Sequence, residues 1–107
     1  MTEPLVRYTK QDGIAVLELN NPPANCYTYE LMRELDEAIL DARMDESVYV
    51  LVLRGAGDKF FCAGADIKML ASVSPQYKYY FCLHANETLN RLEAEVILVL
   101  EIGRAHV

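Results

Sequence analysis

The segment from Gly55 to Asp66 holds the residues of this sequence whose types and spacing are best suited to chemistry. It reads Gly-Ala-Gly-Asp-Lys-Phe-Phe-Cys-Ala-Gly-Ala-Asp and follows an apolar run, Val48–Leu53, with Arg54 between them. If that run forms a buried strand, the segment leaves from the strand's carboxyl end, where open α/β sheets bind ligands. The small residues Ala63, Gly64 and Ala65 would let a flat group lie against the backbone. The segment is therefore the first candidate for a functional site.

Two phosphate-binding motifs are excluded by the spacing within this segment. A dinucleotide fingerprint that begins at Gly55 needs glycine at its sixth position, which is Phe60. A P-loop must end in Gly-Lys followed by Ser or Thr, and this ending is absent from the sequence. A tight connection that uses glycine for positive φ, with no chemical role, remains an open alternative.

A third interpretation of the segment is a site for a negatively charged oxygen. Residues 66–71 are suited to a short helix, so the N–H groups of Ala65 and Asp66 would be among the free donors of its first turn. Such donors stabilise a developing oxyanion, and removing one typically costs roughly 10²–10³ in rate, or about 3–4 kcal/mol. Phe60 and Phe61 are expected to anchor the loop to the core.

Three cations near this segment could neutralise an anionic ligand on an otherwise acidic protein. They are Arg54, Lys59 and Lys68. For any one of them alone, ordinary solvent exposure is the more common explanation.

A hairpin and a helix are expected before this segment. Gly13–Leu19 alternates like a strand, and Leu5–Thr9 is its expected hairpin partner across a Gln-Asp-Gly turn. Asn20 to Pro23 ends the strand, because proline cannot donate to a ladder. Thr28 to about Arg43 has helical periodicity, with Thr28 as N-cap. The apolar stripe of this helix comprises Leu31, Met32, Leu35, Ala38, Ile39 and Ala42.

Val48–Leu53 is apolar on both alternations, which indicates a central strand covered on both faces. After the Gly-rich segment, Ser74-Pro75 resembles an N-cap followed by proline at the first helical position. Val96–Leu100 is expected to form a further strand. The stripe of the helix that starts at Pro75 comprises Tyr77, Tyr80, Phe81, Ala85, Thr88, Leu89 and Leu92.

Composition restricts the class of protein. The chain has 107 residues, 52% of them hydrophobic, and a formal charge of −6. An acidic chain without clustered cations is a poor nucleic-acid or anionic-membrane binder. The longest apolar run has six residues (Val48–Leu53), far fewer than the roughly 20 that span a bilayer. We expect one α/β domain at most, cytoplasmic in location. Three widely spaced cysteines and two histidines support neither a disulfide framework nor a metal site, so buried, reduced thiols are expected.

Two motifs in order resemble the enoyl-CoA hydratase/isomerase (crotonase) superfamily. Phe61 to Lys68, after a Val-Leu-Arg-Gly strand end, is similar to that family's first oxyanion motif. Gly13–Leu19 followed by Asn20 to Asn25 is similar to its opening strand and loop. The resemblance covers about Leu5 to Ala94. It implies the N-terminal part of a crotonase-like spiral of strand–strand–helix units, interrupted before the core is complete.

The resemblance also implies roles for individual residues. The backbone N–H of Ala65 would be one of two donors to the thioester oxygen of an acyl-CoA, whose enolate the family stabilises. Lys68 would lie near the nucleotide phosphates. Coenzyme A enters as part of the substrate, with no prosthetic group, and the complete protein would form homotrimers or hexamers. The residues implied to line the coenzyme A groove are Ala24, Cys26, Ala63, Ala65, Asp66, Ile67 and Lys68.

The family's second oxyanion donor and its acid/base glutamates lie in regions that have no counterpart in this sequence. Glu18 and Glu87 are expected to be surface groups. Residues 1–94 are expected to form a partial crotonase-like domain. Residues 95–107 are expected to be unrelated to it and artificial, because 101–107 matches one reading frame of a sequencing adapter, and His106 is given no role.

Two alternatives to a hydratase or isomerase fragment stay open. One is a non-catalytic acyl-CoA or nucleotide binding module. The other is an interaction piece whose Tyr77, Tyr79 and Tyr80 pack on a partner, although such a stripe is more often core.

Overall fold

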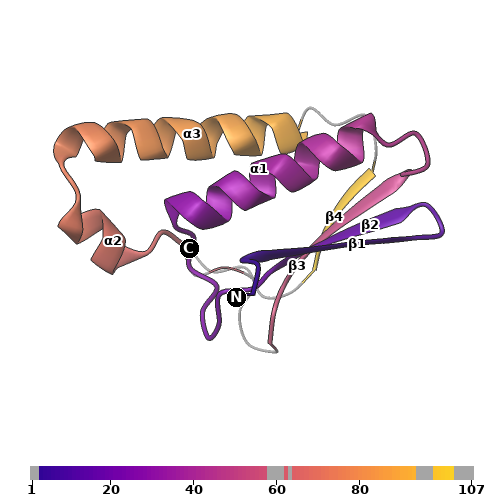
Figure 1. Ribbon diagram of the computed structural model, residues 1–107, viewed down its shortest axis with the longest axis horizontal. Coiled ribbons are helices and arrows are strands. Elements are labelled where there is room, and N and C mark those ends of the chain that lie inside the picture. Colours follow the sequence, from indigo (N-terminus) through magenta and orange to yellow (C-terminus); the bar gives the residue numbers. More distant parts are fainter. Residues whose placement is uncertain (1–2, 58–61, 63, 94–97, 103–107) are drawn as a thin grey trace.

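In the described part of the chain, four strands form one sheet, and three helices accompany it (Figure 1). The computed structural model describes residues 3–57, 62, 64–93 and 98–102. The elements in chain order are β1 (Val6–Gln11), β2 (Ile14–Leu19), α1 (Tyr29–Met44), β3 (Val50–Gly55), α2 (Ile67–Ser72), α3 (Pro75–Glu93) and β4 (Leu98–Ile102). The strand order is β1-β2-β3-β4, with β1 antiparallel to β2 and the other neighbours parallel. The α/β class expected from the sequence is confirmed.

The β1–β2 hairpin is confirmed, and β1 extends two residues beyond the expected end. Asp12 and Gly13 form its turn with φ of 53° and 82°. Two consecutive residues with positive φ match the right-handed twist of the flanking strands. Along β2, the alternate residues Ala15, Leu17 and Leu19 are buried, which places the core on one face of the sheet.

The first helix forms where the periodicity predicts it. The Thr28 hydroxyl accepts a hydrogen bond from the Leu31 N–H at 3.2 Å, as an N-cap should. All six residues of the expected apolar stripe are buried. α1 lies across one face of the sheet and α3 packs alongside it (Figure 1). The crossover from β2 to β3 through α1 therefore builds the core.

The expectation that the third strand is covered on both faces is wrong for the described residues. Leu51 and Leu53 are buried under the helices, whereas Val50 and Val52 are only half-buried on the opposite face. The described helices all lie on one side of the sheet (Figure 1). The strand also begins at Val50, because the Val48 N–H bonds back to the Asp45 carbonyl in a turn.

The long helix α3 begins as expected, with the Ser74 hydroxyl accepting from the Tyr77 N–H at 3.1 Å. Four of the seven residues of its expected stripe are buried as predicted: Phe81, Ala85, Thr88 and Leu92. The prediction is wrong for the other three, because the exposed fractions of Tyr77, Tyr80 and Leu89 are 39%, 58% and 41%. Only one narrow side of α3 contacts α1, so a stripe as wide as the periodicity suggests is not covered by the described residues.

The strand after α3 is confirmed two residues later than expected, at β4, where it pairs in parallel with β3. Residues 96 and 97 lie outside the described residues. The domain boundary between 94 and 95 stays a prediction.

Cysteine burial differs from the expectation. Cys26 and Cys62 are half-buried and Cys82 is exposed, all three as free thiols. Cys82 lies on the side of α3 that faces away from α1. The expectation of mostly buried thiols is therefore wrong.

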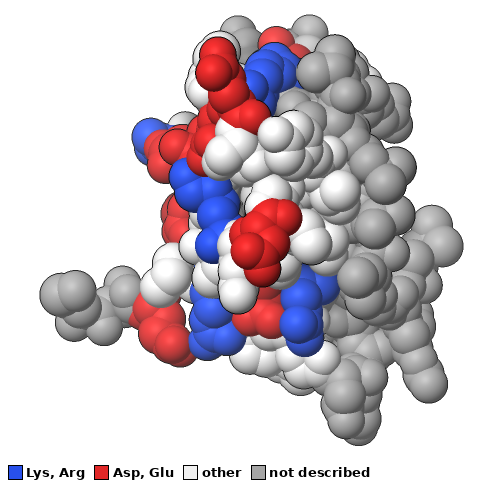
Figure 2. Space-filling view, turned by 90° about the vertical axis from the view of Figure 1, so that its right-hand side faces the viewer, with Lys and Arg blue, Asp and Glu red and all other residues white. Residues whose placement is uncertain are grey.

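Surface charges alternate in sign on the face seen in Figure 2, where acidic and basic side chains interleave over the described part. Ion pairs at the surface include Arg7–Glu18 at 2.8 Å and Lys10–Asp45 at 2.7 Å. Among the described residues, no helix is both long and apolar enough to cross a membrane.

Candidate functional site

A short parallel bridge joins the loop after β2 to the segment before α2. The Tyr27 N–H donates to the Gly64 carbonyl at 2.9 Å, and the Asp66 N–H donates to the Tyr27 carbonyl at 3.0 Å. Tyr27 thereby pairs with Ala65. The two loops suspected of bordering one site are held side by side by this bridge.

The bridge fixes the direction of the Ala65 peptide. Successive backbone groups of an extended chain point to opposite sides, so a residue whose neighbours bond to one strand points its own N–H away from it. Within the part of the chain that the structure describes, the Ala65 N–H donates to no acceptor. Ala65 is half-buried. The result is a fixed backbone donor at the edge of the bridge.

The prediction that the Asp66 N–H is also free is wrong. That N–H donates to Tyr27, because the backbone is still extended at this position and the helix begins one residue later. Asp66 instead acts through its side chain, whose carboxylate accepts from the Met69 N–H at 3.0 Å and caps α2. The predicted short helix and the predicted place of Asp66 at its start are confirmed.

The residues expected to line a groove are distributed around this bridge. Ala24 and Cys26 are half-buried in the loop after β2. Ile67 and Lys68 are exposed in the first turn of α2, Ile67 with 80% of its surface exposed. Ala63 lies outside the described residues, as do Lys59, Phe60 and Phe61. An exposed apolar residue beside an exposed cation suits a ligand that has both flat and anionic parts.

Asn25 is the residue of this region that the sequence did not single out for a role. It is fully buried and has a φ of 53°. Its side-chain oxygen accepts from the Asn21 N–H at 3.0 Å, and its side-chain nitrogen donates to the Ala56 carbonyl at 2.9 Å. The Asn21 side chain in turn donates to the Cys26 carbonyl at 2.8 Å. The loop after β2 is thus shaped by asparagine amides.

Apolar contacts hold the bridge against the helices. The rings of Tyr27 and Phe81 lie 5.8 Å apart between centroids, and Phe81 is buried in α3. Cys62 and Ala65 pack against the same core. Burial raises the pKa of the Cys62 thiol, so this group stays protonated near neutral pH and is a poor nucleophile. The cysteine contributes packing here.

Arg54 does not offer a free charge to a ligand. Its guanidinium lies 3.2 Å from a Glu18 carboxylate oxygen, and the other oxygen of Glu18 bonds to Arg7. Glu18 is a half-buried group paired at the surface, as expected, and Glu87 is exposed. Among the predicted cations that the structure describes, Lys68 is the one in the first turn of α2.

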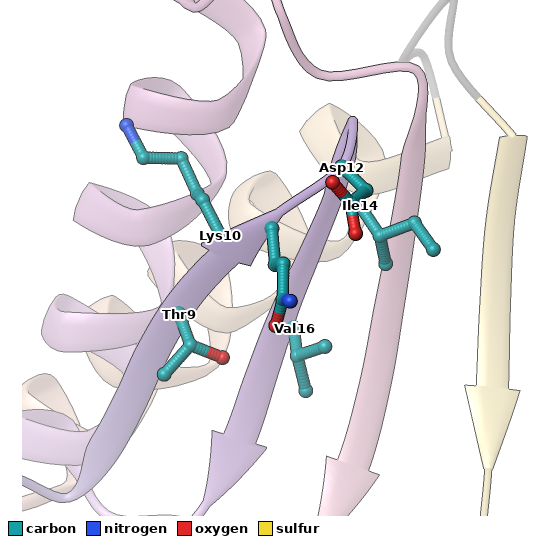
Figure 3. A pocket seen from close by; sticks show the side chains of 6 residues that line it. Thr9, Lys10, Asp12, Ile14 and Val16 are labelled. Carbon is teal, nitrogen blue, oxygen red and sulfur yellow. The ribbon is translucent and has the colours of Figure 1, made fainter.

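A hollow of about 320 Å³ lies elsewhere, on the hairpin. Its lining residues are Thr9, Lys10, Gln11, Asp12, Ile14 and Val16. Figure 3 shows the Lys10 side chain extending toward α1, where its ammonium bonds to Asp45. The hollow is at the turn end of β1 and β2, whereas the bridge follows the opposite end of β2. It therefore does not belong to the same site.

No cluster of histidine, cysteine and acidic residues suited to a metal ion occurs within the described ranges. The bridge itself presents a backbone donor, with small and apolar groups around it.

Comparisons with known proteins agree on one family. The family model for enoyl-CoA hydratase/isomerase matches residues 9–100. The short-chain-enoyl-CoA hydratase of Clostridium acetobutylicum is 33% identical over 85 residues, which is 78% of this chain and 33% of that protein. The crotonyl-CoA hydratase of Syntrophomonas wolfei is 31% identical over 86 residues, or 79% of this chain and 33% of that protein.

Structural similarity extends over more of the chain. A crystal structure of an enoyl-CoA hydratase from Geobacillus kaustophilus has a TM-score of 0.89 and 35% identity, and the match covers 94% of this chain and 38% of that one. The chain thus spans about a third of the length of the curated relatives it matches.

Proposed function

The chain belongs to the enoyl-CoA hydratase/isomerase family, and we propose that it supplies one half of an acyl-CoA site in which the Ala65 N–H binds the thioester oxygen. One observation carries this proposal. Both backbone neighbours of the Ala65 N–H bond to Tyr27, while the Ala65 N–H itself meets no acceptor in the described part of the chain.

The proposed chemistry is stabilisation of an enolate. When a proton leaves or a nucleophile adds next to a thioester, negative charge moves onto the carbonyl oxygen. A donor already held in place stabilises that charge without reorganisation, and one such donor is worth roughly 3–4 kcal/mol in the transition state. The Ala65 side chain contributes only by being small enough to leave the N–H accessible.

Coenzyme A would bind along the two loops. Ala24 and Cys26 border the groove from one side, with Asp66 and the exposed Ile67 on the other. Ile67 offers an apolar surface for the adenine or pantetheine part. Lys68 offers a cation for the phosphates, one residue further along α2. Ala63 is included among the groove residues of this proposal on the family resemblance alone.

Turnover requires groups beyond this half-site. The Asp66 carboxylate caps α2, and Glu18 is engaged by two arginines. Neither is a candidate general acid or base. We assign the second oxyanion donor and the acid/base carboxylates to a segment with no counterpart in this chain. The 107-residue chain is then expected to bind crotonyl-CoA without hydrating it.

Titration of the ¹⁵N-labelled chain with crotonyl-CoA tests the proposal. The Ala65 amide proton is expected to move downfield when it donates to the thioester oxygen. Free coenzyme A should shift the amide resonances of α2, including that of Lys68, without causing the downfield shift at Ala65. Ala65→Pro removes the N–H and should abolish the thioester-specific part of the response. Ala65→Ser keeps the N–H and is the matched control.

Three results would count against the proposal. An unchanged chemical shift of the Ala65 amide proton at saturating crotonyl-CoA would remove the basis of the proposal. Equal responses to crotonyl-CoA and coenzyme A would favour the non-catalytic binding module. Hydration of crotonyl-CoA by the chain alone would contradict the assignment of the acid and base to another segment.

Assembly into trimers or hexamers is proposed for the complete protein. Sedimentation of the complete protein would test this proposal. A monomer in that measurement would contradict the assembly without touching the Ala65 site.

A further inference from the structure

Asn25 links the two loops of the site at a second place. Its side-chain nitrogen donates to the carbonyl of Ala56, which follows β3. Ala56 is itself fixed, since its N–H donates to the Leu19 carbonyl at the end of β2 at 2.8 Å. Two residues after Asn25, Tyr27 makes the backbone bridge to Ala65. The loop after β2 is thus tied to both ends of the segment 56–65.

The backbone of Asn25 is as constrained as its side chain. Its N–H donates to the Asn21 carbonyl at 2.8 Å, and its side-chain oxygen accepts from the Asn21 N–H. A φ of 53° turns the chain so that Tyr27 faces Gly64 and Asp66. Asparagine is among the few residues other than glycine that adopt this conformation readily. The side-chain bonds and the backbone turn act together on the position of Tyr27.

We infer that Asn25 is a positioning residue for the Ala65 N–H, which it holds in place through Tyr27. This inference rests on the proposed function of that N–H. Asn25 touches neither the donor nor the ligand in this scheme. It fixes the loop whose next residues pair with Gly64 and Asp66, and so keeps the Ala65 N–H aimed away from the bridge.

Two substitutions separate the parts of this role. Asn25→Gly retains the left-handed backbone and removes the side-chain bonds to Asn21 and Ala56. Asn25→Asp keeps an oxygen for the Asn21 N–H, but it lacks the donor and brings a carboxylate oxygen toward the Ala56 carbonyl. If the link to Ala56 matters, aspartate should be no better than glycine. If only the turn matters, both variants should resemble the original chain.

Hydrogen exchange of individual amides measures the effect. In Asn25→Gly, the Tyr27 and Asp66 amides are expected to exchange roughly 10–100-fold faster, because the bridge loses its support. Amides of the β2–β3 ladder should change less. The Ala65 amide should still move downfield on addition of crotonyl-CoA, but the apparent affinity measured from that shift should fall by a similar factor. That response is a spectroscopic property of one donor, which general loss of stability does not move.

Val48→Ala is the matched control, since it lowers stability from a buried position remote from both loops. When Val48→Ala and an Asn25 variant have equal denaturation midpoints, Val48→Ala should leave the exchange rates of the Tyr27 and Asp66 amides near those of the original chain. It should also leave the Ala65 response to crotonyl-CoA nearly unchanged. Unchanged exchange of Tyr27 and Asp66 in both Asn25 variants would overturn the inference.

A measurement on the unaltered chain decides the matter if the variants do not fold. Exchange is followed in low concentrations of denaturant. The amides of Asn21, Asn25, Tyr27 and Asp66 should open as one unit with a common denaturant dependence, and independent opening would overturn the inference. If the unaltered chain shows no Ala65 response to crotonyl-CoA, the proposed function fails, and the exchange data still decide whether Asn25 holds the bridge.

Discussion

The two ends of the sheet use similar local structures for different purposes. At the hairpin end, Asp12 has a φ of 53° and Gly13 follows with 82°. At the loop end, Asn25 also has a φ of 53° and Gly64 has 101°. Each end therefore relies on a left-handed non-glycine residue and a glycine to turn the chain.

The two ends differ in what happens to the backbone donors. The Gly13 carbonyl accepts from the N–H groups of both Tyr49 and Val50, which closes the hairpin onto the start of β3. At the loop end, the bridge consumes the N–H groups of Tyr27 and Asp66 and leaves that of Ala65 without an acceptor in the described part. The hairpin end connects elements, whereas the loop end presents a donor. Substitutions at the first should change stability alone, and substitutions at the second should also change the response to crotonyl-CoA.

Ile39→Ala is expected to have the largest effect, because both ends depend on the core between them. Ile39 is fully buried in α1 against the sheet. Truncating such a residue costs about 2–5 kcal/mol, from lost burial and the cavity left behind. Urea denaturation followed by circular dichroism measures this loss. Leu40→Ala, on the exposed side of the same helix, is the control and should cost far less; equal losses would contradict the assigned core.

Paired glycine substitutions give the sharpest test of the difference between the ends. A Cβ at Gly13 would lie 2.8 Å from a ring carbon of Tyr49, and one at Gly64 would meet nothing within 4 Å. Strain at a positive φ costs about 1–3 kcal/mol in either place. Gly13→Ala should therefore lower the denaturation midpoint more than Gly64→Ala. Only Gly64→Ala should weaken the Ala65 response to crotonyl-CoA, and the reverse pattern would refute the distinction.

Local and periodic features were predictable from the sequence. The apolar stripe of α1, the Thr28 and Asp66 caps and the hairpin turn all follow from residue types within a few positions of one another. The role of Asn25 was not predictable from the sequence, because its side chain donates to the Ala56 carbonyl, 31 residues away. A carbonyl is present at every residue, so the sequence does not mark it. Asparagine's tolerance of positive φ was the one available indication.

Long-range contacts also explain the errors. The periodicity of α3 predicts a wide buried stripe that includes Tyr77 and Tyr80, yet burial depends on what the fold brings against each side. The Asp66 N–H looked free because a helix start has free donors, and only the bridge to Tyr27 consumes it. The role of the Ala65 N–H as a donor to a thioester oxygen stays a prediction.

The two helix caps allow the same comparison with smaller expected effects. Thr28 caps α1 in the core, whereas Asp66 caps α2 beside the candidate site. Thr28→Ala removes the cap of α1 and should lower the free energy of unfolding by about 1 kcal/mol. Asp66→Ala removes the cap of α2, a helix with no buried residue, so its effect on global unfolding should be smaller. The Asp66 N–H keeps its bond to Tyr27 in that variant. Amide exchange should show faster opening at Met69 only, and a destabilisation of the whole chain equal to that of Thr28→Ala would contradict this.

The smallest expected effect is the response of the hairpin end to acid. The ammonium of Lys10, and then the Ser47 hydroxyl and N–H, hold the pKa of the Asp45 carboxyl well below its ordinary value of 3.8. Because the pKa is lower in the folded state, the stabilisation is complete above about pH 4 and is lost as the pH falls below that value. Thermal unfolding between pH 2 and 6 should therefore show a shallower decline at the acid end for Asp45→Asn than for the original chain. Because this pair lies at the hairpin end, acid should loosen the turn but leave unchanged the protection of the Tyr27 and Asp66 amides, measured against the intrinsic exchange rate at each pH. Coincident loosening of both ends would mean that they are not independent, and the comparison between them would then have to be abandoned.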